Sequence, residues 1–226
     1  MENQEEGPMR RLRYLGLAVI LALALAGCGD NDSDVRTVFS AEILSDASVD
    51  GDLSLAPWET VPLVTPATDF NEILIGVDGV GVEYRGFVHF PFDGSTAGDI
   101  IPSDADVRFA YVEFFVSSVN FIGTADFLMD LVSFPPPLVP DDYFRDFPHV
   151  TIPLASRTFP MRSDDLYGFV RIEVTPLMRE AIRLGLPDFQ IRILLDLDFT
   201  FGQFGVEDIP GRTGTFTAPL LYVEYY

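Results

Sequence analysis

The feature that most constrains the fold is a nearly strict alternation of apolar and polar residues in residues 188–199. The apolar positions share one parity: Phe189, Ile191, Ile193, Leu195, Leu197 and Phe199. Successive side chains of a β-strand point to opposite faces of its sheet. This period of two therefore predicts a strand with one buried face and one solvated face.

The same alternation recurs along the chain in shorter segments separated by Pro, Gly and Asp. We expect strands at 88–92, 110–116 and 170–174, and further strands at 37–44, 72–77, 126–134, 148–154 and 220–226. Loops are expected at 45–71, 93–105 and 135–147. Many short strands with turn residues between them are typical of a β-sandwich or β-barrel.

One helix interrupts this pattern, in the segment TPLMREAIRLG at residues 175–185. Thr175 suits the N-cap, Pro176 the first helical position and Gly185 the C-terminal stop. At about ten residues, the helix is expected to be a crossover between strands. The sequence shows no internal repeat and no linker that would divide residues 37–226, so we expect one domain there.

The N-terminal segment has the pattern of a signal peptide. Arginines at positions 10, 11 and 13 precede an uncharged run from Tyr14 to Ala26. That run is shorter than the roughly 20 residues needed to span a bilayer, but it has the length of a signal-peptide apolar region. Residues 1–8 cancel the basic charge, so we expect the true start to be Met9.

The run ends in Leu25, Ala26, Gly27 and Cys28, which together resemble a bacterial lipobox. The resemblance implies cleavage after residue 27 and a lipid on Cys28, with residues 28–36 as an acidic tether. A buried free cysteine and a catalytic thiol are the alternatives, although no nearby residue would lower the thiol pKa. Gly29 follows the cysteine, which favours the outer membrane of a bacterial envelope.

Composition narrows the partners. The formal net charge is −21 and all 14 basic residues are arginines. Such a surface repels nucleic acid and anionic lipid headgroups, so neither is expected as a partner. Cys28 is the sole cysteine, so no internal disulfide can form.

The order of the strand segments adds a more specific signal. EILIGVDG is followed by YRGFVHFPFD, IPSDADVRFAYVEFFV, VRIEVTPLMREAIRLG, FQIRILL and PLLYVEYY. This succession resembles the disaggregatase-related β-sandwich domains, which are similar to family 96 carbohydrate-binding modules. Matching positions are Arg85, Phe90, Ile101, Pro102, Ala105, Val107, Ala110, Val174, Thr175, Pro219, Leu221, Val223 and Tyr225. The resemblance implies a jelly-roll-like antiparallel β-sandwich that, in some relatives, binds polysaccharide or packs in the cell envelope.

Motifs for catalysis are missing from the sequence. The chain has two histidines and no lysine, and neither G-x-S-x-G nor H-E-x-x-H occurs. No spacing singles out a glycosidase pair among the 35 acidic residues. We therefore expect a non-catalytic protein, with a polysaccharide hydrolase or lyase as a lower-ranked alternative.

Six polar residues have outward parity on expected strands and form the predicted ligand face: Arg85, His89, Arg171, Glu173, Gln190 and Arg192. Arginine planes can bind hydroxyls and carboxylates, so this face is the candidate glycan site. The alternative is an ordinary exposed face with cross-strand ion pairs. The acidic charge balance favours neutral glycans.

A weaker signal concerns calcium. Asp46, Asp50 and Asp52 are close in sequence, and Ca²⁺ prefers oxygen ligands, so they are a candidate calcium site. The alternative is a solvated acidic loop, which would have the same sequence pattern. The leading hypothesis is a lipid-anchored envelope protein that binds carbohydrate. The alternative is an assembly lipoprotein that binds another envelope protein, because Tyr111 and Phe115 give their strand a second apolar face.

Overall fold

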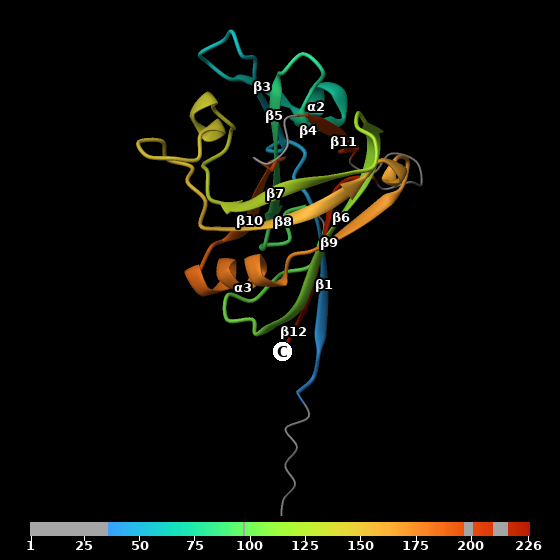
Figure 1. Cartoon of the computed structure of the whole chain (residues 1–226). Helices are drawn as coiled ribbons and strands as arrows, with labels where there is room; N and C mark the ends of the chain where they lie inside the picture. The colour runs from blue at the N-terminus through green and yellow to red at the C-terminus, as the bar shows by residue number, and fades with distance from the viewer. Residues whose placement is uncertain (1–35, 97, 197–200, 210–216) are drawn as a thin grey trace, which may run out of the picture. The chain divides into compact units, whose positions relative to one another are not determined.

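Antiparallel strands build the domain, and they curl so that the two halves of one hydrogen-bonded sheet enclose a common core (Figure 1). The computed structural model describes residues 36–96, 98–196, 201–209 and 217–226, and Val38–Tyr226 forms one compact unit. The structure confirms the predicted all-β, jelly-roll-like sandwich with a short crossover helix. The signal peptide and Cys28 lie outside the described residues, as do Leu197 and Phe199.

The first half of the sheet is built around one long strand. It contains β9 (Phe169–Glu173), β6 (Val107–Val119), β12 (Leu220–Tyr225) and β1 (Phe39–Leu44). Strand β6 pairs with β9 and β12 over its first part and with β11 (Gly202–Glu207) over its last part. Strand β6 thereby joins the two halves of the sheet.

The second half continues from β11 through seven further strands. The path runs through β4 (Glu72–Val77), β5 (Glu83–Pro91), β10 (Asp188–Leu195), β7 (Thr124–Val132) and β8 (Ala155–Arg162). Strand β2 (Gly51–Leu55) pairs with β5 and with β3 (Leu63–Pro66). The predicted loop at 45–71 is therefore wrong, since it contains β2, β3 and the short helix α2 (Ala67–Phe70).

The main core contains the residues that the alternation pointed inward. Val88 and Phe90 on β5 and Ile191 and Ile193 on β10 are fully buried. Phe127 of β7 meets Phe204 of β11 edge to face, with 4.7 Å between ring centroids. Residues of both halves belong to this one core, since Val112 and Phe114 of β6 share a cluster with the buried side chains of β5 and β10.

The crossover helix closes one end of the sandwich, away from β3 and α2 (Figure 1). Helix α3 (Thr175–Leu184) follows β9, leads to β10 and buries Leu177, Met178 and Ala181 against the core. Gly185 ends it with φ 68°, in the left-handed region that glycine tolerates best. The N-cap is Val174 rather than the predicted Thr175, whose hydroxyl instead accepts a 2.9 Å hydrogen bond from the Ala110 amide.

Residues 133–154 form a cover over the outer face of β5, β10 and β7. Strand β2 packs beside this cover. A second core lies beneath the cover, made of Leu53, Phe87, Val132, Phe134, Leu138 and Tyr143. The cover contains the short 3-10 helix η1 (Pro140–Tyr143), and a second one, η2 (Ser163–Asp165), follows β8. The strand predicted at 148–154 is wrong: this segment belongs to the cover and leaves Val150 and Ile152 exposed, while the strand begins at Ala155.

The open edge of β1 is protected by the loop that follows β5. Asp99 and Glu42 exchange hydrogen bonds, with 3.0 Å from the Glu42 amide to Asp99 Oδ2 and 3.0 Å from the Asp99 amide to the Glu42 carbonyl. Thr96 Oγ1 donates to the Leu44 carbonyl at 2.7 Å. Gly98 packs so closely that a Cβ there would lie 2.7 Å from the Glu42 carbonyl oxygen. The loop therefore satisfies a strand edge that would otherwise pair with another chain.

Candidate functional site

The structure divides the predicted ligand face between two distant settings. Arg85, His89, Gln190 and Arg192 point away from the main core, as their parity requires. Gln190 and Arg192 are buried beneath the cover and Arg85 is half-buried against it, whereas His89 is buried beside Asp188 and the segment that carries Asp46 and Asp50. Their predicted solvent exposure is wrong. Alternation reports which face of a strand a side chain lies on, and it carries no information on whether another segment covers that face.

Arg192 is the most deeply buried of these side chains, with no exposed surface. Its Nη1 donates to three carbonyl oxygens of the cover, at 2.8 Å from Asp142, 2.8 Å from Phe144 and 3.0 Å from Thr151. Its Nη2 lies 3.0 Å from Oδ2 of Asp130 on β7. Burial lowers the pKa of Arg192 to about 10, while Asp130 favours the charged form.

Gln190 and Arg85 contact the same cover. The side-chain oxygen of Gln190 accepts a hydrogen bond from the backbone amide of Phe134 at 2.7 Å. The side-chain nitrogen of Gln190 donates one to the Phe134 carbonyl at 3.0 Å. The Arg85 guanidinium lies 3.9 Å from the centre of the Tyr143 ring and donates to the Tyr143 carbonyl. These side chains bind the protein's own loop, which occupies the groups that a glycan would have used.

The three aspartates considered for calcium have separate partners. The Asp46 carboxylate accepts hydrogen bonds from the backbone amide and the hydroxyl of Ser48. The Asp50 carboxyl accepts one from the His89 amide at 2.7 Å, and the Asp52 carboxyl accepts one from the Leu74 amide at 3.2 Å. Within the described ranges, no group of three acidic, histidine or cysteine side chains could hold a metal ion. The predicted calcium site is therefore not assembled.

Asp50 instead forms a buried carboxyl pair with Asp208, which follows β11. Each side chain is 1% exposed and has one carboxyl oxygen, Oδ2, with no hydrogen-bond partner. Ser45 Oγ lies 3.4 Å from Asp208 Oδ1. Burial raises the pKa of Asp208 to about 6, and burial together with the Asp208 charge raises the pKa of Asp50 well above its usual range. The pair is therefore built to hold protons that a solvated aspartate would lose.

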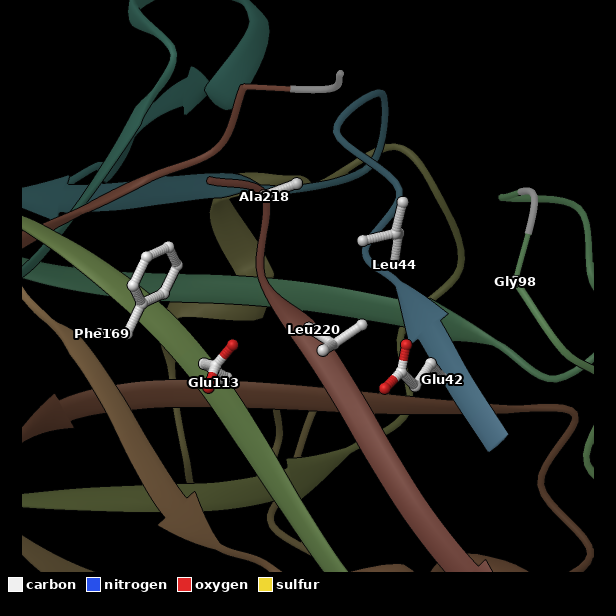
Figure 2. Close-up of a pocket in the computed structure, with 7 residues that line it drawn as sticks. All are labelled: Glu42, Leu44, Gly98, Glu113, Phe169, Ala218 and Leu220. Atoms are coloured by element: carbon white, nitrogen blue, oxygen red, sulfur yellow. The ribbon is translucent and has the colours of Figure 1, made fainter. Parts of the chain in front are cut away.

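The open surface of the domain is the outer face of β9, β6, β12 and β1, over which none of the described segments forms a cover. A groove of about 350 Å³ is lined by Glu42, Leu44, Gly98, Glu113, Phe169, Ala218 and Leu220. Figure 2 shows Glu113 of β6 and Glu42 of β1 on either side of Leu220, with Phe169 beside Glu113. The volume of the groove falls at the lower end of the range for small-ligand sites.

The groove combines an apolar floor with two different carboxylates. Phe169 is 53% exposed, and its ring meets Phe115 edge to face at 5.2 Å. Glu113 pairs with Arg171, at 2.5 Å between Oε2 and Nε. The Glu42 carboxylate has neither an ion-pair nor a hydrogen-bond partner among the described residues.

A stacked row of side chains continues from the groove across three strands. The Arg171 guanidinium of β9 lies 4.9 Å from the centre of the Tyr111 ring of β6, which stacks on Tyr222 of β12 at 4.9 Å. Arg171 and Glu173 are the two predicted face residues that lie here, and Glu173 pairs with Arg157. The outward aromatics noted on β6 are thus real, and they border a groove.

Sequence reasoning missed Glu42, Glu113, Phe169 and Leu220 as site residues. A usable signal existed for Glu113, because it lies between Tyr111 and Phe115 and shares their parity. No comparable signal links it to Glu42, since the pairing of β1 and β6 with opposite edges of β12 is set by long-range contacts.

Comparison with known protein families and curated proteins found no match to this chain. In the described part of the chain, no helix is long and apolar enough to cross a membrane.

Replacing Arg192 tests how the cover is held. We expect Arg192→Met to lower the free energy of unfolding by about 3–5 kcal/mol, because three buried carbonyls lose their donor and Asp130 loses one of its cations. Urea unfolding followed by circular dichroism measures this. Arg183→Met on the exposed face of α3 is the control and should lower the unfolding free energy far less than Arg192→Met, because its ion pair with Glu180 is exposed to solvent. A loss for Arg192→Met below ~1 kcal/mol would show that the second core alone fixes the cover.

The Asp50–Asp208 pair predicts that stability falls as pH rises. The folded pKa of Asp208, about 6, exceeds the unfolded value of about 3.9, so its contribution is present below pH ~4 and lost as pH rises through ~6. Asp52, whose pKa burial also raises to about 6, acts in the same direction. We expect Asp208→Asn to remove roughly 2 kcal/mol of the fall in unfolding free energy between pH ~4.5 and ~7.5.

Urea unfolding at several pH values measures this effect. Asp164→Asn, at an exposed position in η2, is the matched control and should follow the wild-type pH profile. If the Asp208→Asn profile also runs parallel to wild type, the pair does not hold its proton in the folded state.

Proposed function

We propose that this protein is a non-catalytic carbohydrate-binding β-sandwich and that the groove on β9, β6, β12 and β1 is its ligand site. The observation that carries the proposal is an exposed aromatic ring, an apolar floor and two carboxylates gathered in one open groove. Sugars present apolar C–H faces and hydroxyl donors, which match such a floor and such acceptors. The net charge of −21 disfavours acidic polysaccharides.

We further propose that the domain is held at a bacterial cell envelope, with the outer membrane favoured, by lipid on Cys28. This proposal rests on the lipobox-like residues 25–28 and on the basic and apolar segments before them. Several acyl chains on one cysteine would hold the protein firmly, since each buried methylene contributes ~0.8 kcal/mol.

An assembly role is the second candidate, and one surface favours it. Trp58, Val61 and Leu63 near the β2–β3 turn and Val80 in the β4–β5 turn are each more than 60% exposed. The two turns are neighbours, because a Cβ on Gly81 would lie 3.3 Å from Pro57. Exposed apolar side chains gathered in this way are typical of protein-binding surfaces.

The groove proposal predicts that Phe169 is needed for polysaccharide binding. We expect the full chain, in a polyoxyethylene detergent that carries no sugar, to be retained on a neutral polysaccharide. Phe169→Ala should weaken retention by about 10-fold, equivalent to about 1.4 kcal/mol, because it removes the exposed ring of the groove. Affinity electrophoresis over a panel of polysaccharides measures this.

Phe147→Ala is the matched control, since Phe147 is 90% exposed on the cover and lies outside the groove. Equal retention of Phe169→Ala and wild type would place the ligand elsewhere. No retention on any polymer by the folded wild-type protein would contradict carbohydrate binding and favour the assembly role.

The anchor proposal predicts the fate of a cysteine variant. In a bacterial host fed radiolabelled palmitate, wild type should incorporate label and sediment with membranes, whereas Cys28→Ser should do neither, because the acyl acceptor is gone. Label incorporated into Cys28→Ser would exclude Cys28 as the attachment site. Gly29→Ala, next to the cysteine, serves as the control and should still be labelled.

A further inference from the structure

The two carboxylates of the groove lie on strands that flank β12. Glu113 is directly opposite Leu220 in the β6–β12 register, and Leu44 of β1 is opposite Leu220 from the other side. Adjacent strands lie about 4.8 Å apart, so the strands carrying Glu42 and Glu113 are separated by about 10 Å. The two carboxylates therefore border the apolar floor from opposite sides (Figure 2).

Their charges are not equivalent. The ion pair with Arg171 offsets the charge of Glu113, and the Glu113 side chain is 17% exposed. Glu42 is exposed and its carboxylate has no cationic partner in the described ranges. Asp99 adds a second negative charge beside it, since Asp99 Oδ2 accepts the Glu42 amide hydrogen at 3.0 Å. The Glu42 side of the groove is therefore locally negative.

A bare cation would not explain this groove. No three acidic, histidine or cysteine side chains among the described residues could hold a metal ion. The floor of Leu44, Leu220 and Phe169 instead fits a ligand with an apolar body. The ligand that complements both features has an apolar face and a positive charge on one side.

The backbone around the groove argues against an extended peptide as that ligand. A peptide that adds to a sheet needs a free strand edge, and the β1 edge is already bonded to Thr96 and Asp99. The groove lies on the face of the sheet, where flat sugar rings can rest on side chains. An amine-bearing glycan therefore fits better than a cationic peptide.

We propose that the groove selects glycans that carry free amino groups, with the Glu42 carboxylate pairing with the ammonium group. The inference rests on the proposed carbohydrate-binding function and specifies its ligand class. Phe169 and Leu220 contact the sugar ring, and Glu113 accepts hydroxyl hydrogens that every sugar offers. The selectivity resides in Glu42.

Calorimetric titration of the full chain in a polyoxyethylene detergent tests the proposal. The probes are equal-length oligomers of glucosamine, N-acetylglucosamine and glucose. We expect the glucosamine oligomer to bind about 10-fold more tightly than the neutral oligomers at ~50 mM salt, and the advantage to shrink at ~500 mM, where the Debye length is much shorter. Glu42→Gln should remove the advantage, so that this variant binds the glucosamine oligomer and the two neutral oligomers with equal affinity.

Two matched variants complete the design. Glu113→Gln should weaken all three oligomers alike, and Glu59→Gln, an exposed acid at the β2–β3 turn, should change none. Circular dichroism confirms that each variant is folded.

Equal binding of all three oligomers to wild type would overturn the inference and leave the proposed function standing. Binding of none would overturn the proposed function itself. A preference that survives in Glu42→Gln would overturn the role of Glu42. Displacement of the glucosamine oligomer by an equally tight oligolysine peptide would overturn the assignment to glycans.

Discussion

The hydrogen bonds of the buried Arg192 guanidinium hold residues 133–154 over one outer face of the sheet, and the arrangement of the other surfaces depends on them. A charge without solvent contact is costly unless every donor is satisfied. Here Asp130 and three carbonyl oxygens of the cover satisfy it together. If the cover left, Arg192 would keep Asp130 of β7 but lose its three carbonyl acceptors, so the guanidinium holds the cover on one outer face of the curled sheet. The face on β9, β6, β12 and β1, which no described segment covers in this way, carries the proposed ligand site.

The acidic character of the chain has two separate expressions in the fold. Most carboxylates contribute to the net charge of −21, which repels polyanions from the surface. Asp50 and Asp208 are instead enclosed, and burial raises their pKa values so that the protonated forms are favoured. In the groove, Glu113 is balanced by Arg171 whereas Glu42 is not. Acidic side chains thus repel polyanions at the surface, form a pH-sensitive contact in the interior and supply a negative charge on one side of the proposed site.

Much of the fold could be predicted locally. The inward positions on β5, β6 and β10 and the limits of α3 follow from side-chain period and helix-end chemistry. Strands β2, β3, β8 and β11 were not predicted. The first half of β8, residues 155–158, lacks apolar alternation. Strand β8 lies at the edge of the sheet, which is also why Pro160 is tolerated in it. The site was predicted less well, since only Arg171 and Glu173 of the six proposed face residues lie on the open surface.

The sequence by itself determined that this is an all-β protein, which side of β5, β6, β9 and β10 faces the main core, and that polyanions are disfavoured. Strand period and total charge are local or additive properties. Only the tertiary structure decided which outward residues are free. Arg192 and Arg171 both point away from the main core, yet Arg192 has no exposed surface and the Arg171 side chain is 64% exposed. The difference comes from residues 133–154, whose position depends on long-range contacts that no local pattern encodes.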